Sequence, residues 1–592
     1  MQTEGHKSRH HAGAFMHGMI IPLSLAFFLA AGVFLETSRE KHLVGMREAA
    51  RAQVIPTAQL TNGTMGHILR QMRTVRPITN DFSIYPKVAR QDFTPDENIF
   101  VKKRKVGDFL YQVNPAWLSE WHEMSLAPDD GVRPEHFRPG WPLVSIVVNE
   151  DDMDSSEWGI LPHWRDRGKA WEREAHVTYY EEGRPLFSTR AGLRLHGGKS
   201  RIPGNWHSFR LYFRDQYGAE QWPAGLFPDP GADPIRCMLL LNDWPALSPF
   251  VSALAFDFAE RLGCPVQKTV PTMLFINGRS QGIYYLCERL TPEAYASRVG
   301  HSDVLFYQGK QTQQKEARDL NSVMRARFRD LSRPLTMSEA AQYVDLDNHA
   351  ARVLITVYNG TTDGNQGPVV LDKGSDKPRW FWIPWDLDHS FVDVYNWAEK
   401  ETWGKKTWSL MYRGVRPPSV YRHFVNQADM LPVLFSRLMN DDPEYRRWFT
   451  RKTMDAVNHR LNPRFTGERL AHYERMAKAY GVKDMSFMDV YRNFLKKRPA
   501  FMCEQFSRSF GVSEPYTCTV NGPDGIPFEI DGYPESISYK GIYFAGQQIR
   551  VSVPAPEWRT RFSHWMVNGE KRDQASLDLV VRGPLNIEAE CR

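Results

Sequence analysis

The sequence has few cysteines, and none of them has the spacing of a metal-binding finger. Six cysteines occur in 592 residues, and no two of them form a Cys-x-x-Cys pair. Structural zinc sites are commonly built from such pairs, so the pattern argues against one. Cys518 and Cys591 bracket the last segment and could form a disulfide if the chain folds outside the cytosol. Buried free thiols are the alternative.

The sequence also lacks a strong excess of either charge. Its 75 basic and 69 acidic residues leave a formal net charge of +6, and we find no internal repeat and no low-complexity tract. So weak an imbalance argues against a nucleic-acid partner. Hydrophobic residues make up 42% of the chain, which excludes a mostly disordered protein. Because 592 residues exceed what one hydrophobic core organises, we expect two or three domains.

Long apolar runs are scarce as well, and a single one is long enough to cross a membrane. Residues 14–35 are 22 residues without Asp, Glu, Lys or Arg. At about 1.5 Å per residue, such a helix spans a hydrocarbon core of about 30 Å. We therefore predict a transmembrane signal anchor, with residues 1–13 in the cytoplasm and the body extracytoplasmic, in the periplasm or at the cell surface. A cleaved signal peptide, which would leave a secreted protein, is the alternative, because Ala30, Ala31 and Gly32 could form a processing site.

Strand signals begin after a polar, proline-punctuated membrane-proximal region, residues 36–140. Residues 142–148 are a β-branched run typical of a buried strand. Two hairpins follow, one with Glu182-Gly183 in its turn and one with Asn277-Gly278 in its turn. Between them, residues 249–263 have apolar residues at helical spacing.

Helical patterns dominate the second half of the chain. Residues 300–358 and 420–510 are predicted to be helical, with a strand–turn–strand unit at 367–388 between them. Within the second helical stretch, Lys496, Lys497 and Arg498 resemble a solvated helix end. The tail, 512–592, is rich in strand and turn signals and predicts a small all-β module.

Five polar residues, three just before the 367–388 unit and two at its end, are the candidates for chemistry. The acid at 363 would lie in a loop after a helix. The acids at 386 and 388 would lie at the end of an aromatic strand. The five residues are Asp363, Asn365, Gln366, Asp386 and Asp388. Carboxylates at the end of a buried strand are costly without a partner, and a hard divalent cation is one such partner. Ordinary helix and turn capping by Asp is the other explanation.

Several sequence blocks, in the same order, make the chain similar to a known family. The blocks are LRLHGGKSR (193–201), SFRLYFRDQYG (208–218), LLLNDW (239–244), LAFDFAERLG (254–263), FINGRSQGIYYLCERL (275–290) and IPWDLDHSF (383–391). Upstream, VSIVVNEDD (144–152) and KAWERE (169–174) continue the similarity. From about residue 141 to 505, the chain resembles the CotH (spore coat protein H) family of atypical protein kinases.

This resemblance implies an α+β fold, with a two-lobed protein-kinase-like domain over residues 141–510, a β-rich first lobe and a helical second lobe. It also implies ATP and Mg²⁺ (or Mn²⁺) as cofactors, and transfer of phosphate to Ser or Thr of a secreted or surface protein. Asp363 falls on the catalytic-loop Asp of the family and Asp386 on its metal-binding Asp. Asp388 is the second acid of that motif, and Asn365 or Gln366 would add an amide ligand.

The nucleotide side is implied by the same resemblance. Lys199, Arg201 and Arg210 would offset phosphate charge, and Glu288 falls on the acid that closes the second hairpin, where a salt bridge between lobes is an equal alternative. The chain departs from the family pattern in two places. His207 stands in a segment where relatives often carry Lys, and Gly367 and Pro368 stand where they often carry a metal-binding Asn.

Two alternatives to an active kinase follow from these departures. One is a catalytically weak or inactive CotH-like protein that binds a partner at the surface or in coat assembly. The other is a metal-dependent hydrolase that uses the same carboxylates. Residues 512–592 resemble, more weakly, small β repeats of bacterial surface proteins, which implies a binding or spacer role.

Overall fold

The structure is a computed structural model that describes residues 129–203, 207–217, 237–242, 249–361, 366–391, 430–522, 527–535, 538–554 and 556–591. It also describes four short strands before them: β1 (Ile55–Pro56), β2 (Tyr111–Val113), β3 (Glu123–Met124) and β4 (Leu126–Pro128). The predicted membrane anchor at 14–35 lies outside these residues. Among the helices that are described, none has the length and apolar character needed to span a bilayer.

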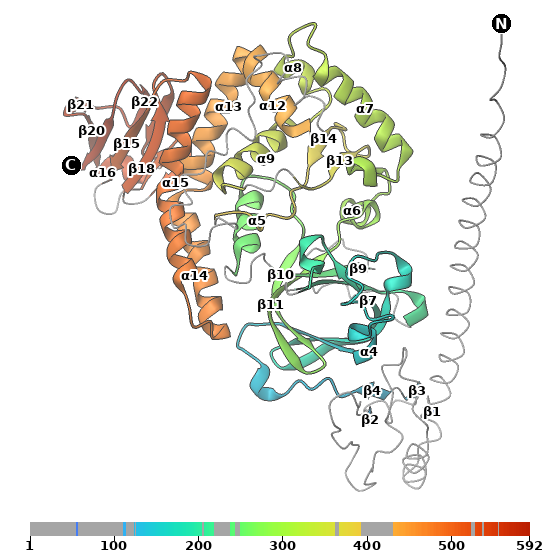
Figure 1. Ribbon diagram of the computed structural model, residues 1–592. Helices are drawn as coiled ribbons and strands as arrows, with labels where there is room; N and C mark the ends of the chain where they lie inside the picture. The colour runs from blue at the N-terminus through green and yellow to red at the C-terminus, as the bar shows by residue number, and fades with distance from the viewer. Residues whose placement is uncertain are drawn as a thin grey trace, which may run out of the picture.

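The fold is mixed α+β, and its first large part is a closed β-barrel (Figure 1). Around the barrel the strand order is β10-β11-β9-β8-β7-β6-β5, with β5 and β10 paired in parallel and the other neighbours antiparallel. The strands are β5 (Leu143–Val148), β6 (Arg173–Glu181), β7 (Arg184–His196), β8 (Ser208–Tyr212), β9 (Cys237–Leu241), β10 (Thr269–Ile276) and β11 (Arg279–Glu288). Short helices decorate the connections: η3 (Pro134–His136), α4 (Glu150–Asp154), η4 (Lys169–Trp171), η5 (Lys199–Arg201) and η6 (Asp215–Tyr217).

Alternation along the strands decides which side chains fill the barrel. Leu193, Leu195 and Leu211 belong to its buried interior. Because successive side chains of a strand point to opposite faces, Arg194 and Arg210 point outward. Both predicted hairpins are confirmed, at β6–β7 and β10–β11. Their turns place a non-glycine residue and then a glycine at positive φ, as a two-residue hairpin turn of this type requires.

The outer face of β9, β10 and β11 packs against the helical part of the molecule. Helix α5 (Val251–Arg261) lies at this junction, and its Phe258 shares one core with Leu239 of β9. Asp257 of α5 accepts hydrogen bonds from Arg469 Nε at 2.7 Å and from the Tyr473 hydroxyl at 2.8 Å. These contacts bind the junction helix to α14 (Pro463–Tyr480).

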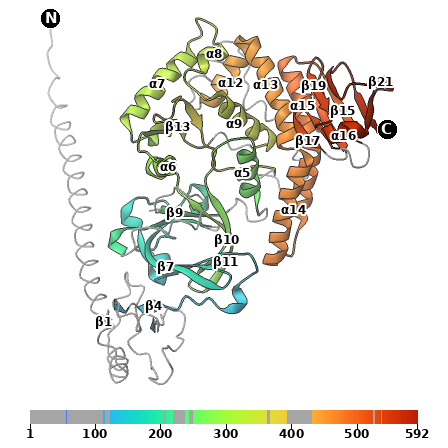
Figure 2. The same cartoon turned by 180° about the vertical axis from the view of Figure 1, so that it is seen from behind.

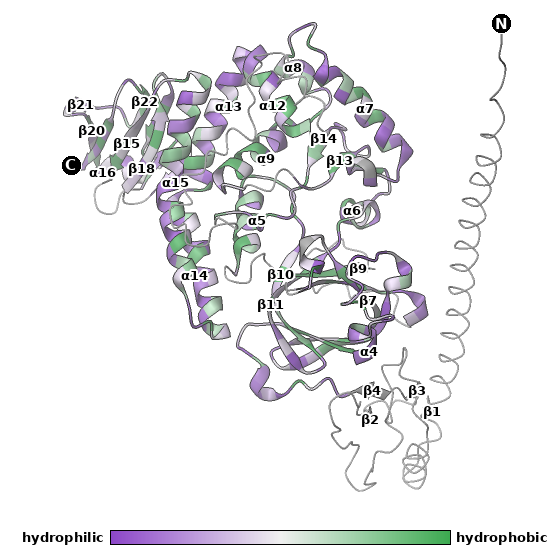
Figure 3. Ribbon diagram, in the orientation of Figure 1, coloured by the Kyte–Doolittle hydropathy of each residue, from purple (hydrophilic) through white to green (hydrophobic). Residues whose placement is uncertain are grey.

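The helical part surrounds a small three-stranded sheet, in the order β12-β13-β14. Its strands are β12 (Val304–Tyr307), β13 (Val369–Asp372) and β14 (Trp380–Trp382). Its remaining helices are α6 (Pro292–Val299), η7 (Gly309–Gln311), α7 (Lys315–Arg329), α8 (Met337–Ala340), α9 (Leu346–Tyr358), α12 (Met430–Asp441), α13 (Pro443–Asp455), the π-helix η9 (Ala456–Arg460) and α15 (Ser486–Phe510). Figure 3 shows these helices with hydrophilic and hydrophobic sides, and α7 is largely hydrophilic.

Within this part, the prediction that residues 300–358 are all helical was wrong at one place. Strand β12 lies inside that range and pairs with β13, which is about sixty residues later in the chain. A four-residue apolar run cannot by itself be assigned to helix or strand. Here the run is a strand because it pairs with β13.

Arg498 corrects a second prediction, because it is not part of a solvated helix end. Its side chain is 1% exposed and donates from Nε to the carbonyl oxygen of Tyr358 at 3.2 Å, and from Nη2 to that of Val357. Helix α15 thereby satisfies carbonyls at the end of α9, which have no partner within their own helix. Lys496 and Lys497 are exposed, as predicted, but they lie in the middle of α15 (Ser486–Phe510) and not at a helix end.

The C-terminal residues form two sheets that share a core around the fully buried Trp565. The first sheet has the order β18-β15-β23-β20-β21 and the second β17-β16-β19-β22. The elements are β15 (Pro515–Asn521), β16 (Phe528–Ile530), β17 (Tyr533–Glu535), β18 (Ser538–Phe544), β19 (Gln548–Ser552), α16 (Pro556–Arg561), β20 (Phe562–Val567), β21 (Glu570–Arg572), β22 (Ser576–Val580) and β23 (Leu585–Cys591).

These sheets pack directly on the helical part (Figure 2). His459 of the π-helix stacks on Tyr533, with ring centroids 4.2 Å apart. The neighbouring Asn458 exchanges two hydrogen bonds with the backbone of Ile542, at 2.9 and 2.8 Å. Both side chains therefore join the π-helix to the C-terminal sheets.

The suggested disulfide between Cys518 and Cys591 is not formed. All six cysteines are free thiols. Cys518 is paired with Leu585 across β15 and β23, so Cys591 lies six residues farther along β23. That separation is roughly 20 Å, far beyond the Cα distance of about 7 Å that a disulfide tolerates.

We expect the protein to lose stability in mild acid because two of its histidines are buried. Burial lowers the pKa of both His176 and His349 to about 4, with Arg190 adding to the effect at His176. In the unfolded chain both titrate near 6.5, so between pH 6.5 and 4 the unfolded state binds protons that the folded state does not. Going from pH 7.5 to 5.5 should therefore remove about 3 kcal/mol of unfolding free energy.

Urea titration at the two pH values measures this loss. In a His176→Gln, His349→Gln double variant the difference between pH 7.5 and 5.5 should shrink by about 3 kcal/mol. An unchanged difference in the double variant would show that other groups cause the acid sensitivity.

Candidate functional site

The segment that carries Asp386 and Asp388 is fastened to both sides of the loop that follows α9. Upstream of the loop, Thr361 Oγ1 lies 2.9 Å from Ser390 Oγ, and the amide of Phe391 donates to the carbonyl of Asn359 at 2.8 Å. Downstream, the amide of Trp385 donates to the carbonyl of Gln366 at 3.4 Å. Asp363 and Asn365 lie outside the described residues, but the residues on either side of 362–365 are in contact with the segment that bears the two acids.

Asp386 and Asp388 follow β14 on a segment that alternates between buried and accessible positions. Ile383 and Leu387 are buried at 0% and 1% exposure and anchor it, while Asp386 is exposed and Asp388 is half-buried. Asp386 has a φ of +56°, in the left-handed region that few residues other than glycine and Asn or Asp adopt. Such a conformation persists only where surrounding contacts hold it, and it is common at functional sites.

Gly367 explains one departure from the family pattern. Its φ is +126°, and a Cβ at this position would lie 1.9 Å from the carbonyl oxygen of Ile383. No side chain fits there, so no metal ligand can come from position 367. Asn365 and Gln366 remain the predicted amide ligands.

A buried arginine donates a hydrogen bond to the residue that follows the same loop. Arg352 of α9 is 1% exposed, donates from Nη1 to Thr356 Oγ1 at 2.6 Å, and donates from Nη2 to the carbonyl of Gln366 at 3.2 Å. The carbonyl of Gln366 therefore accepts hydrogen bonds from both Arg352 and Trp385, which fixes the backbone that carries its half-buried side chain.

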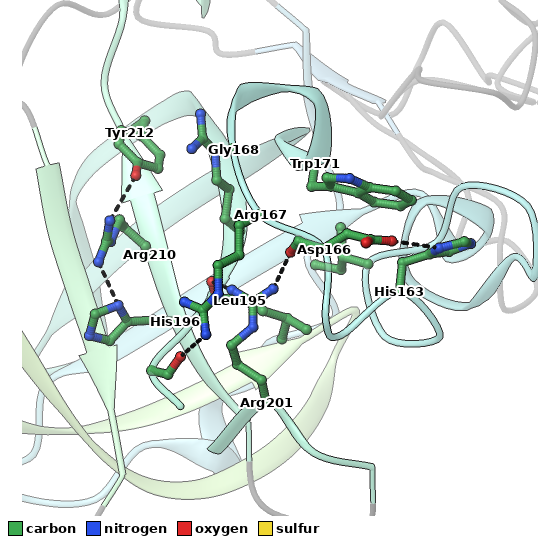
Figure 4. A pocket seen from close by; sticks show the side chains of 13 residues that line it. His163, Asp166, Arg167, Gly168, Trp171, Leu195, His196, Arg201, Arg210 and Tyr212 are labelled. Carbon is green, nitrogen blue, oxygen red and sulfur yellow. Dashed lines mark hydrogen bonds and ion pairs between the residues drawn. The ribbon is translucent and has the colours of Figure 1, made fainter. Parts of the chain in front are cut away.

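A second feature, on the outer face of the barrel, is a cavity of about 200 Å³ rich in arginine (Figure 4). It lies between β7, β8 and the loop that precedes β6. The arginines that line it are Arg167, Arg194, Arg201 and Arg210. Two of the residues predicted to bind nucleotide, Arg201 and Arg210, thus come together here. The side chain of the third, Lys199, is not described.

Arg210 is held in the cavity by two neighbours. Its Nη2 lies 2.7 Å from His196 Nδ1, and its Nη1 donates to the Tyr212 hydroxyl at 3.0 Å. Since a guanidinium can only donate, His196 must accept at Nδ1 and be neutral. Burial, followed by the charges of nearby arginines led by Arg210 and Arg289, lowers the pKa of His196 to about 3, which agrees with that role.

Arg201, which is predicted to bind nucleotide, is engaged by the backbone of neighbouring segments. Its side chain, 7% exposed, donates to the carbonyls of Trp164 at 2.7 Å and Leu195 at 3.0 Å, and also to that of Asp166. Three backbone carbonyls therefore engage this guanidinium. Arg201 fixes the loop around residue 165 against β7, and shapes the cavity rather than presenting a free cation.

Glu172 balances part of the positive charge beside the cavity. This buried carboxylate pairs with Arg194 at 2.5 Å and Arg214 at 3.0 Å, and accepts the Tyr217 hydroxyl at 2.9 Å. The guanidinium carbons of Arg194 and Arg214 both lie over the Tyr212 ring, 4.5 and 4.6 Å from its centroid. The side chains along this edge of the cavity are therefore preorganised.

Glu288 lies apart from the cavity and has a structural partner. Its carboxylate pairs with Arg298 of α6 and accepts the amide of Lys268 at 2.7 Å. Burial raises its pKa despite the opposing effect of Arg298. Glu288 is predicted either to contact the nucleotide or to form a structural salt bridge. These contacts favour the salt bridge, which joins the end of the barrel to the first helix beyond it.

Sequence reasoning missed Arg167, Arg194 and His196 as members of the cavity. Arg194 and His196 alternate with Leu193 and Leu195, so their outward direction could have been read from the strand period. Arg167 lies in a loop without a motif, and only the fold brings it to β7.

Comparison with known proteins places the chain in a family. A family model described as CotH kinase protein matches residues 193–502, slightly more than half of the chain. The chain belongs to the CotH kinase family. A comparison with curated proteins finds no match.

The CotH match includes the positions of all nine predicted site residues. It begins after Arg167 and Glu172, so part of the arginine cavity comes from residues outside the matched region. In the described part of the chain, no group of three or more His, Cys, Asp or Glu side chains is placed to hold a metal ion, and Asp363 is not among the residues so described.

Proposed function

We propose that this CotH protein is a two-lobed, kinase-like phosphotransferase that moves the terminal phosphate of ATP to Ser or Thr of a secreted or surface protein. The barrel is the first lobe and the helical part is the second. The observation that supports it best is the fastening of both sides of loop 362–365 to the segment with Asp386 and Asp388. In protein kinases, a catalytic-loop Asp and a metal-binding Asp must come together in this way.

Each residue has a stated role in the transfer. Asp363 orients the acceptor hydroxyl and accepts its proton as the oxygen attacks the terminal phosphate. Asp386 and Asp388, with an amide from Asn365 or Gln366, form an all-oxygen donor set that fits Mg²⁺ or Mn²⁺. The metal, when bound, offsets charge on the phosphates. Exposure of Asp386 and its fixed backbone suit a carboxylate that meets a ligand from solvent.

The arginine cavity supplies positive charge on the barrel side. Arg210 is permanently charged and oriented by His196 and Tyr212. It would stabilise the phosphate chain in place of the lysine that relatives often carry near position 207. Preorganised charge of this kind stabilises the transition state without rearrangement.

A second candidate, a CotH-like binding protein with little or no catalysis, is favoured by His207. Its Nδ1 lies 3.0 Å from the carbonyl of Ser200, and burial lowers its pKa. A neutral imidazole at this point cannot replace the charge of a lysine. The two candidate functions differ in whether the charge of Arg210 replaces the charge of the missing lysine.

The setting of the reaction is part of the proposal. Residues 14–35 would anchor the protein in a membrane, with the body extracytoplasmic and facing secreted or surface acceptors. The alternative, release after signal cleavage, leaves the chemistry unchanged.

Transfer of ³²P from [γ-³²P]ATP by the full-length protein in detergent, with Mg²⁺ or Mn²⁺, tests the function. Labelling of the protein itself or of a Ser-rich acceptor, lost in an Asp363→Asn variant, is expected. Nucleotide binding without transfer would support the binding protein instead. Metal-dependent release of a product without nucleotide would identify a hydrolase.

A further inference from the structure

The arginine cavity carries more positive charge than its own carboxylates neutralise. Arg167, Arg194, Arg201 and Arg210 line it, and Arg289 is near enough to lower the pKa of His196. Asp166 is the one carboxylate among the lining residues, and its Oδ2 lies 3.0 Å from His163 Nδ1. Glu172, beside the cavity, is already shared between Arg194 and Arg214. Several guanidinium charges in one small space are therefore left in need of an anion.

The four lining arginines differ in how fully they are engaged. Arg201 is used by backbone carbonyls, whereas Nε of Arg194 and Nε of Arg210 are buried and have no hydrogen-bond partner. A buried donor without an acceptor costs about 1–3 kcal/mol, so both side chains are held in place by their other contacts, Arg194 by Glu172 and Arg210 by His196 and Tyr212.

Arg167 is the lining arginine most available to a ligand. It is exposed, and its Nη2 donates one long hydrogen bond, 3.4 Å, to the carbonyl of Gly197 (Figure 4). It comes from the loop on one side of the cavity, while Arg194 and Arg210 come from the strands on the other. These three lining arginines thus come from three separate segments of the chain.

The size of the cavity limits what it can enclose. About 200 Å³ is below the range of roughly 300–1,000 Å³ usual for a pocket that encloses a drug-sized ligand. It suits a short chain of phosphates rather than a whole nucleotide. Guanidinium groups match phosphate oxygens in paired, charge-assisted hydrogen bonds.

We propose that this cavity binds a di- or triphosphate chain through Arg167, Arg194 and Arg210, and that it does so without a divalent cation. The inference rests on the proposed function only in taking the phosphate chain of the donor nucleotide as the natural ligand. Fixed arginine charge replaces the metal in binding, and the carboxylates at 386 and 388 serve the transfer step alone. Donor binding and metal binding are then separable in this protein.

Calorimetric titration of the full-length protein in EDTA tests the proposal, with inorganic tripolyphosphate, ATP and adenosine as probes. Tripolyphosphate and ATP should both bind in EDTA, and adenosine should not. Arg167→Ala should weaken binding about 10- to 100-fold, the usual cost of a charged hydrogen-bonded pair. Arg165→Ala is the matched control, because it removes the same charge from an exposed position in the same loop; it should change affinity less than about 3-fold by loss of long-range attraction alone.

The outcomes separate this inference from the proposed function. Binding that requires Mg²⁺, or equal losses in Arg167→Ala and Arg165→Ala, would overturn it even if phosphate transfer is observed. Asp386→Asn should retain binding in EDTA. Tripolyphosphate binding in a protein that never transfers phosphate would support the cavity and reject the kinase. Binding of tripolyphosphate but not ATP would support the anion site and overturn its assignment to the donor.

Discussion

Asp386→Asn is expected to lower the rate of phosphate transfer at least about 100-fold while leaving the fold intact. The side chain is exposed, so its charge contributes little to packing, and asparagine also accepts φ values near +56°. What is lost is one carboxylate of the set proposed to hold the divalent cation. The measurement is the initial rate of ³²P transfer at saturating ATP and a range of Mg²⁺ concentrations, together with the melting temperature.

The matched control for this variant is Asp376→Asn. Asp376 is exposed in the turn between β13 and β14, on the same hairpin, and the substitution removes the same charge. Its transfer rate should stay within about 2-fold of the unmodified protein, as for a surface substitution away from the site. Equal rates for Asp386→Asn and the unmodified protein would rule out Asp386 as a metal ligand.

Arg498→Met is expected to destabilise the protein by about 3 kcal/mol. The guanidinium is almost completely buried and donates to the carbonyls of Val357 and Tyr358 at the end of α9. Methionine fills much of the space but has no donor, so the Tyr358 carbonyl would lose its hydrogen bond from Arg498, and the Val357 carbonyl would keep that from the amide of Gly360 at 3.2 Å. Burial lowers the pKa of Arg498 to about 9, so the group is charged at neutral pH and its burial is maintained by these hydrogen bonds.

Chemical denaturation followed by circular dichroism measures this loss, with Lys496→Met as the control. Lys496 is exposed on the same helix, two residues away, and its replacement should change stability by no more than about 0.5 kcal/mol. The end of α9 leads into loop 362–365, so Arg498→Met should also reduce transfer below the unfolding temperature. If its stability matched that of Lys496→Met, the capping role of Arg498 would be refuted.

The Glu172 cluster shows why part of the site could not be predicted. Glu172 joins Arg194 and Arg214, and the hydrogen bond to Arg214 crosses 42 positions of sequence. No local pattern marks such a pair, because it depends on the register of β6, β7 and β8 around the barrel. Gly192 is part of the same arrangement, since a Cβ there would lie 2.5 Å from the Glu172 carboxylate.

The acidic segment was predicted more fully. The aromatic strand and the two acids after it were recognised from sequence, and residues beside these acids contact Asn359, Thr361 and Gln366 on either side of loop 362–365. The left-handed backbone at Asp386 was not foreseen, because it is imposed by packing on both sides. The requirement for glycine at 367 became visible with the nearby carbonyl of Ile383.

Both hairpins and most helices could be predicted from the sequence, because turn geometry and strand or helix periodicity are short-range properties of the chain. The order of its sequence blocks was enough to identify the CotH family and the candidate acids. Only the folded chain shows which arginines line one cavity, that Glu288 pairs with Arg298 and that Arg498 is buried. A long side chain can lie in solvent or reach a distant carbonyl with the same local sequence. Whether such a side chain is exposed or buried depends on which groups the folded chain brings within hydrogen-bonding distance of it.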